Sequence, residues 1–140
     1  MSLFGGDAKK TEGHDALAAE RMRLEGMPLA DLAAEVMTRT WGPGGPAGTG
    51  ESETGELTML HIVKQFNPDG RVFGVDHAAV GAIQSVVEEA VQRLEHAELV
   101  VIRYRGGSSS TLSYRPTRAG LEAIAAGDVR ARLARLGAAG

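Results

Sequence analysis

Residues 85–120 constrain the fold of this chain more than any other stretch, because nearly every junction in them carries a local signal. Ser85 and Glu88 have the spacing of a capping box, which predicts that a helix begins there. A β-branched run, a glycine and serine turn, and an alternating segment then predict a β-hairpin over 99–115. Thr117 is a suitable N-cap for a closing helix. The stretch therefore predicts helix, hairpin and helix in succession.

Upstream of that stretch, the sequence predicts two helices and a linker. A thin apolar stripe over 14–24 indicates one helix, and a stronger apolar face over 28–37, continuing to Trp41, indicates another. Residues 42–55 contain six glycines and two prolines and carry almost no apolar side chain, so they are expected to form a flexible linker. The polar residues 1–13 are expected to be mobile.

Between the linker and Ser85 the pattern predicts three short elements. Apolar side chains at three-residue steps predict a buried helix over 56–66. A small strand over 71–74 and a short helix over 77–83 follow, with Gln84 as the turn before the next helix. The chain thus divides into four parts: residues 1–41, with a mobile N-terminus and one or two helices; the linker 42–55; a domain over 56–126; and a helical extension over 127–140.

This order of elements resembles that of the winged helix-turn-helix superfamily. The run AVQRLEHAELVVIR resembles the ALxRLExxGLVxR run of bacterial regulators of the MarR and PadR type, and YRPTRAG resembles their YxLTxxG junction. The likeness covers about residues 56–125. It implies an α+β fold, a winged helix with additional N-terminal and C-terminal helices, and a homodimer that binds double-stranded DNA to regulate transcription. Glu98 replaces the glycine of that pattern, so the turn there is expected to be built differently.

The charge distribution favours a second interpretation. The chain has a net charge of −3, and residues 56–118 carry seven basic and seven acidic groups, whereas a domain that neutralises phosphates usually has a basic excess. Glu88 and Glu89 follow the predicted helix start, where the helix dipole favours them but phosphates repel them. The alternative is therefore a winged helix that serves as a protein–protein interaction module in a larger bacterial assembly, without DNA binding.

Candidate site residues follow from the resemblance. On DNA, Ser85, Gln92 and Arg93 are expected to face the bases, while Arg103, Arg105 and Arg118 are expected to meet phosphates. The flanking amphipathic helices supply a hypothetical dimer or partner interface, and their alternative role is to cover the domain's own core. The interface candidates are Leu29, Leu32, Val36, Trp41, Val129, Leu133 and Leu136.

The sequence contains no pattern typical of metal binding, catalysis or membrane insertion. The chain lacks cysteine and its four histidines share no ligand spacing, so neither a metal nor a cofactor is expected. No nucleophile, base and orienter occur together, which predicts that the protein is not an enzyme. There is no long apolar run and no basic, apolar leader, so the protein is expected in the cytoplasm, away from the membrane.

Overall fold

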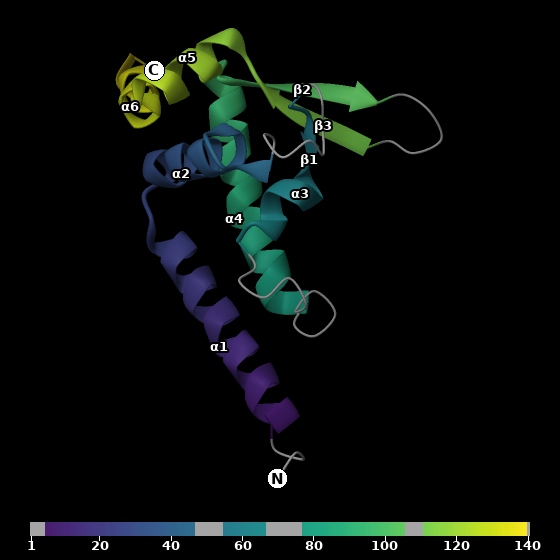
Figure 1. Ribbon diagram of the computed structural model, residues 1–140. Coiled ribbons are helices and arrows are strands. Elements are labelled where there is room, and N and C mark those ends of the chain that lie inside the picture. The colour runs from purple at the N-terminus through teal and green to yellow at the C-terminus, as the bar shows by residue number, and fades with distance from the viewer. Residues whose placement is uncertain (1–4, 47–54, 67–76, 106–110, 140) are drawn as a thin grey trace.

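The computed structural model describes residues 5–46, 55–66, 77–105 and 111–139 and has an α+β architecture within them (Figure 1). A long helix in the middle of the molecule is covered by helices at its sides and by a small sheet at one end. The elements are α1 (Gly5–Gly26), α2 (Leu29–Trp41), β1 (Leu57–Thr58), α3 (Met59–Lys64), α4 (His77–His96), β2 (Val100–Arg105), β3 (Thr111–Pro116), α5 (Arg118–Ala126) and α6 (Val129–Ala139).

The central helix is α4, and the core forms where the other elements pack against it. In Figure 1, α2 crosses α4, α1 runs along its first half, and α6 lies beside α2 at the C-terminal end. The largest side chains that are fully shielded from solvent come from all of these helices. They include Leu17, Leu24, Leu32, Met37, Ile62, Phe66, Ile83, Leu94 and Leu133. None of the helices described is both long and apolar enough to cross a membrane.

The sheet is antiparallel, with the strand order β1-β3-β2. Tyr114 in β3 lies between Leu57 of β1 and Ile102 of β2, and Ser113 pairs with Arg103. Because side chains alternate between the two faces of a strand, Tyr114 and Ile102 point toward α4 while Arg103 and Ser113 point away from it. The sheet therefore presents two chemically different faces.

The helix predicted over 56–66 is only partly correct. Leu57 and Thr58 form β1, and the helix is confined to Met59–Lys64. Leu57 is buried against β3, whereas Leu60, expected on the same helical face, is exposed. Pairing with a strand more than fifty residues away overrides the local helical pattern here.

The prediction of two helices separated by a turn at Gln84 is wrong. Residues 77–96 form the single helix α4. Ser85 is not an N-cap, since its Oγ donates to the Gly81 carbonyl 3.1 Å away, and Glu88 completes no capping box but accepts from Gln84 Nε2 at 3.0 Å. No residue between His77 and His96 breaks a helix strongly, so the backbone continues through the apparent cap. Glu88 consequently lies in the second half of α4 and not at its leading end.

The predicted hairpin and closing helix are confirmed. Strands β2 and β3 pair along their whole length, and Thr117 caps α5, its Oγ1 accepting from Gly120 N–H at 3.0 Å. Gly127 ends α5 in the left-handed conformation, and α6 follows. Gly120 lies so close to the residue before β2 that a Cβ there would overlap the Leu99 carbonyl oxygen.

The turn after α4 is not built differently, despite Glu98. Glu98 adopts a φ of 62°, the left-handed conformation that glycine most often provides after the last turn of a helix. The Leu99 N–H donates to the Leu94 carbonyl at 3.0 Å, and the Glu98 carbonyl accepts from Thr117 Oγ1 at 2.6 Å. These bonds hold a residue with a side chain in a conformation that costs it about 1 kcal/mol.

The N-terminal segments differ from the prediction in extent. The helix expected over 14–24 spans Gly5–Gly26, and the helix expected from Pro28 begins at Leu29 and ends at Trp41. Residues 47–54 of the predicted linker and the predicted strand 71–74 lie outside the described residues. Trp41 Nε1 donates to the Gly55 carbonyl at 2.8 Å, which ties the far end of the linker segment to α2.

Candidate functional site

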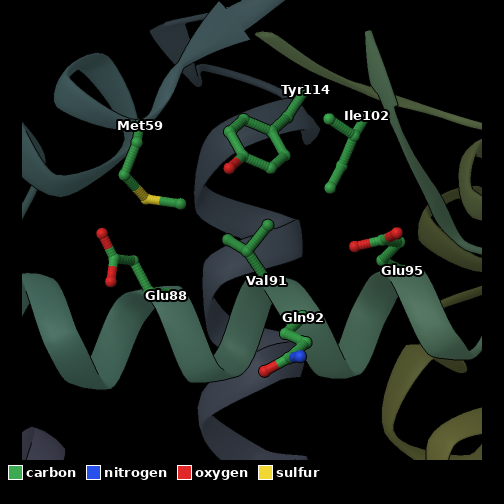
Figure 2. Close-up of a pocket in the computed structure, with 7 residues that line it drawn as sticks. All are labelled: Met59, Glu88, Val91, Gln92, Glu95, Ile102 and Tyr114. Atoms are coloured by element: carbon green, nitrogen blue, oxygen red, sulfur yellow. The ribbon is translucent and has the colours of Figure 1, made fainter. Parts of the chain in front are cut away.

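A cleft of about 260 Å³ opens between α4 and the sheet (Figure 2). Figure 2 shows Glu88 and Glu95 rising from α4 on either side of Val91, with Tyr114 and Ile102 facing them from the sheet. The lining combines apolar side chains with four polar ones: Met59, Val91 and Ile102 on the one hand, and Glu88, Gln92, Glu95 and Tyr114 on the other.

Two regular spacings bring these side chains together. Glu88, Val91, Gln92 and Glu95 lie at i, i+3, i+4 and i+7 of α4, and residues at those positions share one face of a helix. Ile102 and Tyr114 are direct partners in the β2–β3 register and thus lie on one face of the sheet. The continuity of α4 and the register of β3 together therefore determine the cleft.

The two carboxylates of the cleft have no cationic partner among the residues that the structure describes. Glu88 accepts one hydrogen bond, from the neutral amide of Gln84. The Glu95 side chain has no hydrogen bond or ion pair within the described part of the chain. Within the part of the chain that the structure describes, both charges thus face the cleft without a compensating cation.

Tyr114 is the other polar group of the cleft. Only 8% of the residue is exposed, yet its hydroxyl has no hydrogen-bond partner among the described residues. Figure 2 shows the hydroxyl directed into the space between Met59 and α4. Burial raises the pKa of Tyr114 above its ordinary value, and the negative charges of Glu88 and Glu95 raise it further. The negative potential of both carboxylates therefore reaches the Tyr114 hydroxyl.

The residues predicted to face bases are dispersed along α4. Ser85 and Gln92 are exposed, and Gln92 lines the cleft. Arg93 is half-buried, and its Nη2 donates to the Leu133 carbonyl of α6 at 3.0 Å. The guanidinium thus links α4 to α6, and base contacts by these three residues stay a prediction.

The residues predicted to meet phosphates lie on the hairpin and at the start of α5. Arg103 is on the sheet face opposite the cleft, where its Nη1 donates to Glu56 Oε1 at 2.8 Å. Ser113 Oγ donates to the other oxygen of the same buried carboxylate. Arg118 is exposed at the first position of α5, and the side chain of Arg105 lies outside what the structure describes.

The predicted interface residues mostly fill this chain's own core. Leu29 alone among those described is exposed, at 40%. The side chain of Leu136 falls outside the described set. An interface role for this group stays a prediction, and the buried members are Leu32, Val36, Trp41, Val129 and Leu133.

Sequence reasoning missed most of the cleft. The sequence pattern indicated Glu88 as a capping residue and, with Glu89, as an acidic group that phosphates repel, but it did not indicate Glu95, Tyr114 or Met59 as site residues. The seven-residue spacing of Glu88 and Glu95 was the available signal, because it places two carboxylates on one helical face two turns apart. Within the described residues, no three His, Asp or Glu side chains gather in a way that would hold a metal ion.

Comparisons with known proteins give no further guidance, since no protein-family model, curated protein or solved structure matches this chain.

Proposed function

We propose that the chain is a winged-helix protein–protein interaction module whose α4 face contacts a partner protein rather than DNA. The proposed domain starts at α2, one element earlier than the sequence pattern predicted. The order α2, β1, α3, α4, β2 and β3, with sheet order β1-β3-β2, supports this assignment. The proposal includes no catalytic activity.

The observation that carries the proposal is the charge on the exposed side of α4. The helix contains three glutamates, Glu88, Glu89 and Glu95, and the first two are exposed. Its only arginine, Arg93, donates to the backbone of α6. The exposed face of a helix that reads DNA approaches a polyanion, and carboxylates without a compensating cation oppose that approach. A protein partner has no such requirement.

The second candidate is a DNA-binding transcriptional regulator that acts as a homodimer. It is favoured by the arginines of the hairpin: Arg103 and Arg115 lie on the same face of the sheet, and Arg118 is exposed nearby in sequence. Arginines on a wing can hold phosphates or enter a minor groove. However, Arg103 already compensates Glu56, which lowers the net positive charge of that face.

Fluorescence anisotropy with random duplex DNA over a salt series separates the two candidates. The interaction module is expected to show no binding at about 50 mM salt, because its exposed α4 face is acidic. Micromolar or tighter affinity that falls steeply with salt would establish the DNA-binding alternative instead. In that case, replacing Arg103 and Arg105 by Ala should reduce the salt slope by roughly one unit for each lost phosphate contact.

Site-specific photo-crosslinking in the native host provides the direct test. A photoreactive residue is introduced in place of Ser85, which is exposed on α4 and lies outside the cleft. Crosslinks from this position therefore detect any partner of the α4 face, whether or not the cleft is occupied. The matched control is the same residue in place of Glu122, which is exposed on α5. A protein adduct that forms from position 85 and not from position 122 is expected. Adducts with DNA, or equal adducts from both positions, would contradict the proposal.

A further inference from the structure

Two kinds of acceptor in the cleft are left without full compensation by the described residues. Among the described residues, the carboxylates of Glu88 and Glu95 have no cation, and the hydroxyl of Tyr114, a residue that is only 8% exposed, has no hydrogen bond. The tyrosine is independent of the acidic pair, because it comes from the sheet and is directed into the cleft (Figure 2). Both features point to a group supplied from outside.

We infer that the cleft binds an arginine side chain from a basic segment of a partner protein, with the guanidinium between the Glu88 and Glu95 carboxylates and beside the Tyr114 hydroxyl. This inference rests on the proposed interaction function and specifies the chemistry of the partner.

Arginine matches the cleft in both its polar and its apolar parts. The guanidinium has five N–H donors in a plane and no acceptor, which suits a site that offers two carboxylates and a hydroxyl oxygen. Its aliphatic stem packs favourably on apolar side chains, which Met59, Val91 and Ile102 provide. Charge-assisted bonds from guanidinium to carboxylate are stronger than neutral ones.

The size of the cleft favours a single side chain over a small-molecule ligand. Its volume of about 260 Å³ is below the range of roughly 300–1,000 Å³ that is usual for cofactor and drug-sized ligands. Nucleic acid is disfavoured because its phosphates would meet the two glutamates. A divalent cation such as Ca²⁺ is usually held by several carboxylates, and the described residues include no group of three acidic or histidine side chains that could hold a metal ion. A protein segment with an exposed arginine meets each of these restrictions.

The binding test uses the isotope-labelled full-length chain and a short arginine peptide. The probe is acetyl-Gly-Gly-Arg-Gly-Gly-amide, and the control peptide carries citrulline, which has nearly the same shape but no charge. The arginine peptide is expected to produce saturable NMR shifts at the amides of Glu88, Gln92, Glu95 and Tyr114. The citrulline peptide is expected to bind at least about tenfold more weakly, which is the effect of losing one charge-assisted interaction.

Variants of the chain locate the binding. Glu88→Gln together with Glu95→Gln is expected to weaken arginine binding by about tenfold or more. The matched control is Glu89→Gln, which changes the neighbouring exposed glutamate on the same helix but lies outside this cleft, against α1 and α2. The affinity of the Glu89→Gln variant for the arginine peptide is expected to stay within about twofold of that of the unmodified chain. Tyr114→Phe is expected to weaken binding less than the double glutamate variant.

Several results would overturn the inference: equal shifts with the citrulline peptide, an equal loss in Glu89→Gln, or no saturable shift up to about 10 mM peptide. A thermal melt of each variant shows that it is folded, so a loss of binding is not a loss of structure. Failure of the proposed function is a separate result. DNA binding with an intact arginine site would contradict only the function, whereas a protein adduct from position 85 without peptide binding would contradict only the cleft.

Discussion

The carboxylates between α1 and α2 and those in the cleft form two acidic groups with opposite environments. On the α1–α2 side, Arg23 Nη2 lies 2.7 Å from Glu20 Oε1 and 2.7 Å from Glu35 Oε2, and Arg39 lies 3.4 Å from Glu35. The Arg23 hydrogen bonds hold the pKa of Glu35 below its ordinary value. In the cleft, the two glutamates have no such cation among the described residues. Two acidic groups that look alike in the sequence therefore differ in whether the chain itself neutralises them.

The sheet repeats this contrast across its two faces. Glu56 is buried on the outer face and is compensated by Arg103 and the Ser113 hydroxyl. Tyr114, the residue after Ser113 in β3, points to the inner face, and its hydroxyl has no hydrogen bond to any residue that the structure describes. A carboxylate with its own cation stabilises the fold, while one without is available to a cation from elsewhere. Substitutions at each group should show this difference in the free energy of unfolding. The largest loss of stability is expected at the compensated carboxylates and the smallest in the cleft.

The largest effect is expected when Glu56 loses its cation. Arg103→Met should destabilise the chain by about 2 kcal/mol, because it leaves a carboxylate that is 7% exposed without its guanidinium. The value is below that for a fully buried pair, since the Arg103 side chain itself is 56% exposed. Urea unfolding of both chains at neutral pH measures the difference.

The control for that experiment is Arg115→Met on the same face of the sheet. Arg115 is exposed in the neighbouring strand, so its loss should change stability by less than about 0.5 kcal/mol. Equal effects at the two positions would show that Glu56 does not depend on Arg103.

A smaller effect is expected for the α1–α2 group. Arg23→Met should cost about 1 kcal/mol or less near pH 7, because the three side chains are partly exposed and the ion pairs are screened. The folded-state pKa of Glu35 lies below its ordinary value of 4.5, so its contribution is present above about pH 4.5 and is lost as the pH falls through the folded pKa. Urea unfolding of wild type and variant should therefore differ near neutrality and converge in acid. A difference that persists at low pH would assign the effect to packing.

The sequence predicted the region after Leu99 correctly because the signals there are local. A β-branched run, a glycine and serine turn and the Thr117 cap each act within a few residues, and their neighbours support them. The region before it was predicted less well because distant contacts decide it. Leu57 becomes a strand residue by pairing with Tyr114, and Ser85 continues a helix that packs on α1 and α2.

The cleft was hidden for the same reason. It exists only when α4 is continuous and when β3 lies between β1 and β2, which no local pattern specifies. The seven-residue spacing of Glu88 and Glu95 could have indicated an acidic helical face. That Tyr114 faces it depends on the strand register, a tertiary property.

Removing the cleft carboxylates should not destabilise the chain. Glu88→Gln together with Glu95→Gln is expected to leave stability unchanged or to raise it by up to about 0.5 kcal/mol, because neither charge has a cation to lose among the described residues. Urea unfolding beside Arg23→Met makes the comparison directly. A loss as large as in Arg23→Met would mean that the cleft carboxylates are compensated within this chain and are not available to a partner.

The smallest effect at neutral pH is expected for Tyr114→Phe, at no more than a few tenths of a kcal/mol, because the hydroxyl forms no hydrogen bond within the described chain. Alkaline pH should separate the two proteins. Burial and the two cleft carboxylates raise the folded-state pKa of Tyr114 above its ordinary value of 10.0, so its contribution is present below about pH 10 and is lost as the pH rises through the folded pKa. Urea unfolding at about pH 9 should give nearly equal stabilities, whereas at about pH 11 the Phe variant should be the more stable. If both proteins lost stability equally, the pKa of Tyr114 would be the same in the folded and unfolded chains. The cleft carboxylates would then have no effect on the hydroxyl.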